Sequence, residues 1–289
     1  MSAGNNTRLG IVLMIAVSVV FASQDGISRH LASEYNVYMV VMIRFWFFAA
    51  FAITISSRKA GGIMAAARTT RPMIQTLRGA LLAAQICVMV TSFTILGLVE
   101  SHAVFAAYPL LIAALSGPIL GEYVGWRRWV AIGIGFIGVL IILKPGLGVF
   151  NPAAVIPLIA AVMFATYGLL TRYVSRDDPT ATSFFWTGTV GAVAITSVGI
   201  WFWEPMTGSD WMWMGALCIT GSVGHWLLIR CYEVAEVSAV QPFAYFQLVF
   251  ASAVGITVFG EALQMNVLIG AGIVVAAGLF TLWRERQQG

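Results

Sequence analysis

The sequence predicts an all-α membrane protein whose ten transmembrane helices form two inverted five-helix repeats. Of the 289 residues, 60% are hydrophobic and only 10% are charged, whereas about a quarter of a soluble domain is charged. The apolar residues form long continuous runs, which fit helices that cross a bilayer better than the alternating strands of a membrane barrel. Short motifs recur in the same order in both halves of the chain, which indicates a duplication.

Ten apolar runs are separated by polar, basic or Gly- and Pro-containing stretches, and each is long enough to cross a membrane. They cover residues 9–28, 37–56, 77–98, 101–120, 127–143, 153–173, 180–201, 211–232, 237–259 and 265–283. The first run follows Arg8 as the core of a signal peptide would, but it continues towards Ile27 and is predicted to be the first helix. Ten helices of about 20 residues each leave no room for a soluble domain.

The basic residues predict the orientation, because Lys and Arg accumulate in cytoplasmic loops. Alternate loops and tails on one side hold Arg8, Arg58, Lys59, Arg68, Arg71, Arg127, Arg128, Arg172, Arg176, Arg284 and Arg286. The opposite side has Arg29 and Lys144. We therefore expect an inner (plasma) membrane protein with both termini in the cytoplasm. These basic residues set the orientation and account for the net charge of +4. No nucleic-acid partner is therefore predicted.

The longest polar stretch runs from Arg58 to Arg78 and contains Gly61, Gly62 and Pro72. Its basic composition predicts a solvated loop or a short surface helix against lipid headgroups. No ligand site is expected there.

The recurring motifs divide the chain into residues 1–148 and 149–289. The matching pairs are Phe21-Ala22-Ser23 with Phe164-Ala165-Thr166, Gly79-Ala80-Leu81 with Gly215-Ala216-Leu217, and Gly121-Glu122 with Gly260-Glu261. Each half holds five predicted spans. Because five is odd, the second half must cross the membrane in the opposite sense to the first. Inverted repeats of this kind are typical of secondary transporters, with the substrate site near the midplane between the halves.

Several patterns typical of other functions have simpler explanations. Gly133 to Gly138 spell GxGxxG, but inside an apolar span, where glycines serve close helix packing. The three cysteines form no CxxC pair, so no metal or disulfide site is predicted. No cofactor is expected. Ser222 and His225 lie three residues apart on one predicted helix face and leave open an alternative, an intramembrane hydrolase.

Charged residues inside spans usually face the protein interior and mark functional sites. Asp25, Arg44 and His102 are therefore predicted to act in gating or coupling, with a structural ion pair as the alternative. Pro109 and Pro242 are predicted hinges, since proline removes a backbone donor and kinks a helix. Polar and aromatic residues near these hinges and in other spans predict a substrate-binding cavity; they are Gln85, Tyr108, Tyr167, His225, Trp226, Gln241 and Tyr245.

The duplicated five-span unit, Arg44 in the second span, and the Gly-Glu pairs that close the fourth and ninth spans resemble the drug/metabolite transporter superfamily, in its EamA-type branch. Within that branch the chain is most similar to bacterial aromatic amino acid exporters. The resemblance implies a ten-helix fold with a central cavity and export from the cytoplasm by alternating access. It implies a small-molecule substrate and the lipid bilayer as partners, no obligate protein partner, and no enzymatic activity.

Overall fold

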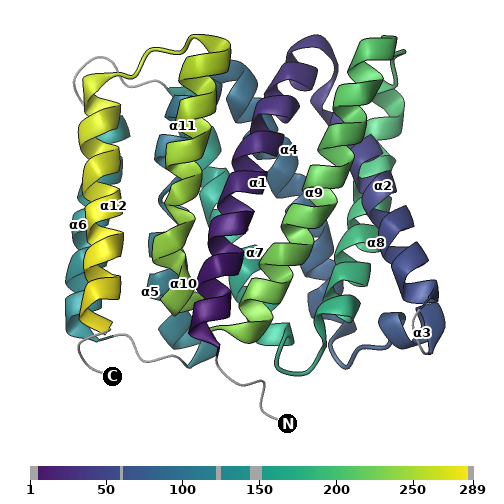
Figure 1. Cartoon of the computed structure of the whole chain (residues 1–289), viewed down its shortest axis with the longest axis horizontal. Coiled ribbons are helices and arrows are strands. Elements are labelled where there is room, and N and C mark those ends of the chain that lie inside the picture. Colours follow the sequence, from purple (N-terminus) through teal and green to yellow (C-terminus); the bar gives the residue numbers. More distant parts are fainter. Residues whose placement is uncertain (1–5, 59–60, 122–124, 144–151, 286–289) are drawn as a thin grey trace.

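The computed structural model describes residues 6–58, 61–121, 125–143 and 152–285, and this part of the chain contains helices and no strand. The long helices run side by side between two ends of the molecule (Figure 1). They are α1 (Thr7–Glu34), α2 (Val37–Ser57), α4 (Pro72–Phe105), α5 (Tyr108–Leu120), α6 (Trp126–Leu143), α7 (Val155–Val174), α8 (Thr180–Gly199), α9 (Gly208–Val234), α10 (Val237–Ala244), α11 (Phe246–Phe259) and α12 (Met265–Glu285). The short α3 (Gly62–Ala67) follows α2, and single 3₁₀ turns precede α7 and follow α8. The first turn of α1 and the last turn of α12 lie at the same end.

By length and composition, seven described helices can cross a membrane, and two shorter apolar helices accompany them at Trp129–Ile142 and Met265–Ala277. One of the seven, Pro72–Leu120, has 49 residues, more than twice the length that a crossing needs. The all-helical membrane class predicted from the sequence is therefore confirmed.

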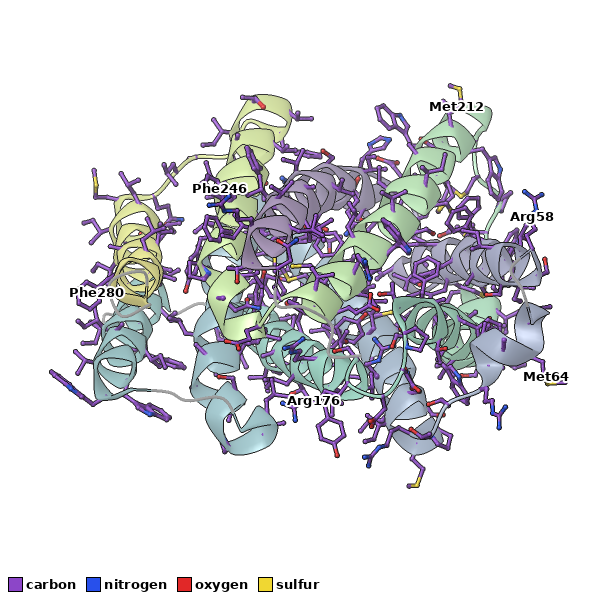
Figure 2. The ribbon with its side chains drawn as sticks, turned by 60° about the horizontal axis from the view of Figure 1, so that its bottom comes forward. Arg58, Met64, Arg176, Met212, Phe246 and Phe280 are labelled. Atoms are coloured by element: carbon purple, nitrogen blue, oxygen red, sulfur yellow. The ribbon has the colours of Figure 1, made fainter. Side chains whose placement is uncertain are left out.

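The outer surface is apolar, as lipid contact requires. Met212, Phe246 and Phe280 are exposed at the periphery (Figure 2). The principal packing pairs are α1 with α9, α2 with α8, α4 with α7, and α6 with α12. Each pair joins one helix from residues 1–148 to one from residues 149–289, so the two parts of the chain interlock along their length.

Gly97 interrupts α4 and turns the chain back into the bundle. Its φ of 79° and ψ of 178° lie in a region that only glycine adopts readily. The Glu261 carboxylate accepts hydrogen bonds from the N–H groups of Leu98 (2.8 Å) and Val99 (2.7 Å), and it forms an ion pair with Arg29. Glu261 thus caps the helix that restarts after Gly97. Its sequence counterpart Glu122 lies outside the described residues.

The expectation of a solvated stretch up to Arg78 was wrong. Helix α4 begins at Pro72, which suits a first helical turn because it needs no backbone donor. From there the helix enters the bundle, so that Gln75 and Arg78 are completely buried. Composition could not predict this, because three of the groups that accept hydrogen bonds from Arg78 lie about a hundred residues further along the chain.

Candidate functional site

A cavity of about 40 Å³ lies in the bundle interior where α1, α2, α4, α7, α9 and α11 meet. Its polar lining consists of Gln24, Asp25, Arg44, Gln85, His225 and Gln247. Four phenylalanines complete much of the wall: Phe21, Phe93, Phe105 and Phe164. A few placed polar groups among aromatic rings are typical of a small-molecule site. Both parts of the chain contribute to it.

The acidic side of the cavity is built around Asp25. Its Oδ2 accepts a hydrogen bond from Gln247 Nε2 (3.1 Å) and lies 3.0 Å from His102 Nε2. The other ring nitrogen, Nδ1, lies 3.0 Å from the carbonyl oxygen of Leu98. A carbonyl only accepts, so Nδ1 carries a proton. The contact between Nε2 and Oδ2 is a hydrogen bond when a proton lies on one of these two atoms.

His102 is held in this position by its surroundings. Its ring stacks on Phe93 with centroids 5.1 Å apart and planes 9° from parallel. The helix that carries it is the one capped by Glu261. The acidic side therefore depends on the chain reversal at Gly97.

The basic side of the cavity is Arg44, whose side chain is buried. Its Nη2 donates to Gln24 Oε1 (2.9 Å) and lies 3.4 Å from His225 Nε2. Among the described residues no carboxylate lies within ion-pairing distance of this guanidinium. Gly221 makes room for it, because a Cβ there would lie 2.5 Å from Arg44 Nε. Arg44 is thus a buried cation that neutral groups hold at the cavity.

A second buried arginine, Arg78, has a different environment. Its guanidinium donates to the side chains of Gln75, Thr171 and Thr187 and to the carbonyl of Ser183, at 2.7–3.2 Å. It also lies 5.4 Å from the centroid of the Tyr167 ring. These contacts join α4 to α7 and α8. Protein groups occupy every nitrogen of Arg78, so its role is structural.

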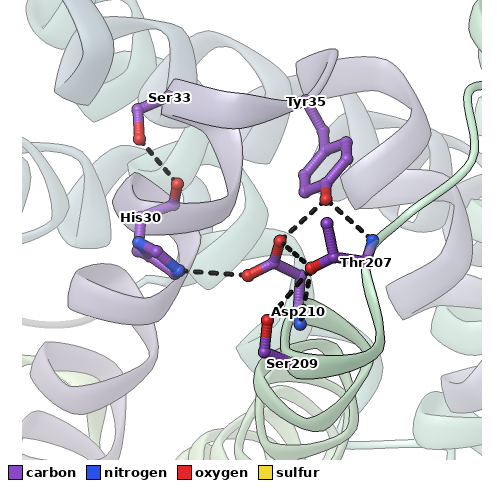
Figure 3. Close-up of polar contacts among 6 residues, drawn as sticks. All are labelled: His30, Ser33, Tyr35, Thr207, Ser209 and Asp210. Carbon is purple, nitrogen blue, oxygen red and sulfur yellow. Dashed lines mark hydrogen bonds and ion pairs between the residues drawn. The ribbon is translucent and has the colours of Figure 1, made fainter.

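The end of the bundle opposite the first turn of α1 has a polar cluster of its own (Figure 3). The Asp210 carboxylate accepts hydrogen bonds from Tyr35 OH (2.7 Å) and Thr207 Oγ1 (2.6 Å) and lies 3.4 Å from His30 Nε2. Tyr35 OH also accepts from the backbone N–H of Thr207 (3.0 Å). The cluster fastens the end of α1 to the start of α9, which closes this end of the interface between the two parts of the chain.

The structure brings together some of the residues that the sequence singled out. Asp25, Arg44, Gln85 and His225 line the cavity, and His102 contacts Asp25. The others lie elsewhere, as follows. Tyr108 and Tyr167 are buried behind Phe164. Gln241 and Tyr245 are also buried, and Gln241 donates a hydrogen bond to Tyr232 OH (3.1 Å). Trp226 is 44% exposed on the outside of α9.

Both predicted hinges lie beside helix breaks. Pro109 is in the first turn of α5, directly after the break between α4 and α5. Pro242 lies inside α10, just before the break at Tyr245 that separates α10 from α11. Helices α5 and α10 contact each other, so the two broken helices meet in the interior.

Sequence reasoning missed Gln24 and Gln247. Gln24 adjoins Asp25, which could have indicated it. On a continuous helix Gln247 would not share a face with Gln241 and Tyr245. The break at Tyr245 changes the direction in which the residues after it face.

The hydrolase alternative needs a hydrogen bond between a nucleophile and its base. The buried Ser222 Oγ has no hydrogen-bond partner among the described residues, and His225 Nε2 faces Arg44. This geometry does not activate Ser222.

Comparisons with known proteins agree with a transporter. The model of a family described as the EamA-like transporter family matches residues 8–144 and again residues 151–283. An S-adenosylmethionine uptake transporter of Rickettsia prowazekii is 25% identical over 282 residues, which is 97% of this chain and 95% of that protein. A riboflavin transporter of Vibrio cholerae is 25% identical over 291 residues, 99% of this chain and 97% of that protein. A solved crystal structure shares the fold across 98% of both chains, with a TM-score of 0.70 and 18% identity.

These relatives are named as transporters and not as enzymes. Their names do not include aromatic amino acid export, so they do not support the narrower resemblance to aromatic amino acid exporters.

Proposed function

We propose, because this chain belongs to the EamA-like transporter family, that it is a secondary transporter of small amphipathic organic solutes that works by alternating access. One observation carries the proposal: buried Asp25 and Arg44 line a single interior cavity whose wall comes from both parts of the chain. Charged groups inside a membrane protein are costly and mark substrate or ion pathways.

Ten crossings in two inverted halves, residues 1–148 and 149–289, provide the two gates that alternating access requires. The break at Gly97 supports this count, because it divides the 49-residue span into two crossings, and the two shorter apolar helices supply two more. The two family matches, over residues 8–144 and 151–283, support the division. The basic residues at the end that holds the first turn of α1 support cytoplasmic termini.

The cavity must enlarge during transport. Its volume of about 40 Å³ holds a few water molecules, whereas ligand pockets measure about 300–1,000 Å³. In the described conformation the site is therefore too small for such a ligand. The helix breaks beside Pro109 and Pro242 are the points at which the surrounding helices can bend.

Asp25, His102 and Arg44 act in gating or coupling. The contact between Asp25 Oδ2 and His102 Nε2 lies at the cavity wall, where substrate binding can displace a proton held between the two groups. Transport coupled to this site would depend on a pH gradient, and uncoupled transport would not.

Substrate and direction are tested together. The sequence indicated export of aromatic amino acids, while the relatives are named for S-adenosylmethionine uptake and for riboflavin. Purified protein in liposomes is assayed with labelled tryptophan, phenylalanine, alanine, lysine, S-adenosylmethionine and riboflavin, inward and outward, with and without a pH gradient. At least one amphipathic member of the panel should move faster than in protein-free liposomes. Failure of every compound in both directions would contradict the proposal.

A matched pair of variants locates the pathway. Met89 is buried at the cavity wall, and Met212 is 74% exposed on the outside of α9. Met89→Trp fills the cavity and should lower flux by about tenfold or more, since a packed interior has no space for the added ring. Met212→Trp faces lipid and should leave flux unchanged. Equal flux through both variants would place the pathway elsewhere.

A further inference from the structure

We propose that the cavity binds the zwitterionic head group of an α-amino acid. The Arg44 guanidinium takes the carboxylate of the substrate, and Asp25, beside His102, takes its ammonium group. This assignment rests on the proposed transport function and specifies the substrate class of the same site.

The lack of a direct ion-pair partner for Arg44 among the described residues is the first support. The guanidinium lies at the cavity wall, is 3% exposed, and is held by a glutamine and a histidine, with no carboxylate in ionic contact among the described residues. Of its nitrogens, only Nη2 has a hydrogen bond in the described part of the chain. Arg78 is the internal comparison, because protein groups engage all of its nitrogens. Arg44 therefore keeps donors for an anion that arrives in the cavity, and a carboxylate matches a guanidinium in charge and shape.

The second support is the free capacity of Asp25. Its Oδ2 contacts His102 Nε2 and Gln247 Nε2, while Oδ1 has no hydrogen bond among the described residues. A carboxylate oxygen at a cavity wall accepts from an ammonium group, which carries three donors.

The two charges are also placed for a single ligand. Arg44 bonds to Gln24, and Gln24 is the neighbour of Asp25 on α1. The basic and acidic groups thus border the same cavity without neutralising each other directly. A ligand that bears one negative and one positive group a few bonds apart satisfies both, whereas a simple anion or cation satisfies one.

The rest of the wall fits the remainder of such a ligand. The rings of Phe21, Phe93, Phe105 and Phe164 surround the charged groups. Aromatic faces accept flat rings by stacking and accept cations through their quadrupole. Tryptophan and S-adenosylmethionine carry an amino acid head group and such a side chain, whereas riboflavin carries no amino acid head group.

Paired ligands test the assignment on the purified full chain in lipid nanodiscs. Binding of L-tryptophan is compared with tryptamine, and binding of S-adenosylmethionine with its decarboxylated form. Each analogue lacks only the carboxylate. At least one intact amino acid should bind about 10–150-fold more tightly than its analogue, the range for a hydrogen bond to a charged group.

Arg44→Gln should abolish this preference by weakening the intact amino acid and leaving the analogue unchanged. Arg58→Gln removes the same charge at the exposed end of α2 and should preserve the preference. If Arg44→Gln does not fold, Arg44→Lys, which keeps the charge but not the fork, should reduce the preference.

Three results would overturn the assignment. The first is that Arg44→Gln weakens the binding of the amino acid and of its analogue equally, which indicates a structural role for Arg44. The second is that the wild-type protein binds the amino acid and its analogue with equal affinity. The third is binding and transport of riboflavin without either amino acid, which refutes the head-group site but leaves the transport function intact. If no compound binds or moves, the transport function fails as well.

Discussion

Gly97 offers a sharp test of how the acidic side of the cavity is built. Gly97→Ala places a Cβ 2.8 Å from Glu261 Oε1, and the backbone φ of 79° with ψ of 178° is one that alanine resists. The backbone strain costs about 1–3 kcal/mol. The displaced carboxylate also weakens its hydrogen bonds to Leu98 and Val99, and a bond to a charged acceptor contributes about 1.5–3 kcal/mol. We expect a total loss of about 2–5 kcal/mol in the free energy of unfolding.

Thermal unfolding in detergent, followed by the fluorescence of the ten tryptophans, measures this loss. At about 2–4 °C per kcal/mol for a chain of this size class, the midpoint should fall by about 4–20 °C.

Two further glycines calibrate the result. Gly260→Ala has a φ of 65° and no atom within 4 Å of the new Cβ, so only the cost of about 1–2 kcal/mol for a left-handed residue remains. Gly133→Ala lies in α6 with an ordinary φ and open space and should be neutral or slightly stabilising. An unfolding midpoint of Gly97→Ala equal to that of Gly133→Ala would refute the reasoning.

Three other predictions follow from the polar contacts. Arg78→Met should lower the free energy of unfolding by about 3–5 kcal/mol, since several buried acceptors lose their donor and each unsatisfied group costs about 1–3 kcal/mol. The same thermal assay with Arg44→Gln, whose guanidinium has fewer protein partners, should show a smaller loss, and the reverse order would contradict the two roles. Ser222→Ala removes a buried hydroxyl that has no hydrogen-bond partner in the described part of the chain, so flux in liposomes should be unchanged, whereas loss of function would revive the hydrolase alternative. Tyr35→Phe removes two hydrogen bonds that join the end of α1 to the start of α9. Each bond contributes about 1 kcal/mol, so the substitution should speed amide exchange in the last turn of α1 by about 10–30-fold. Unchanged exchange would show that the cluster does not fasten this end.

The all-helical membrane class could be predicted from the sequence because hydropathy reports directly on membrane burial. Continuous apolar runs located the helices, and the prolines indicated the breaks near Pro109 and Pro242. Hydropathy did not place the start of α4, since Arg78 looks like a loop residue until its partners on α7 and α8 are known.

The site was predictable only in part. Asp25, Arg44 and His102 were identified because a charged or imidazole group in an apolar run is conspicuous. The contact between Asp25 and His102 could not be derived, as it depends on the chain reversal at Gly97. Gln247 escaped because the irregular break before it alters the helical phase, and periodicity arguments assume a continuous helix.

Alternating access requires the cavity to open to each side of the membrane in turn. Val90 is buried at its wall. A single cysteine at that position, Val90→Cys, in a variant with Cys87, Cys218 and Cys231 replaced by serine, reports on access. A membrane-impermeant thiol reagent should label it from either side of oriented vesicles, and a transported substrate should slow labelling from both. Labelling from one side alone, or labelling indifferent to substrate, would contradict alternating access through this cavity.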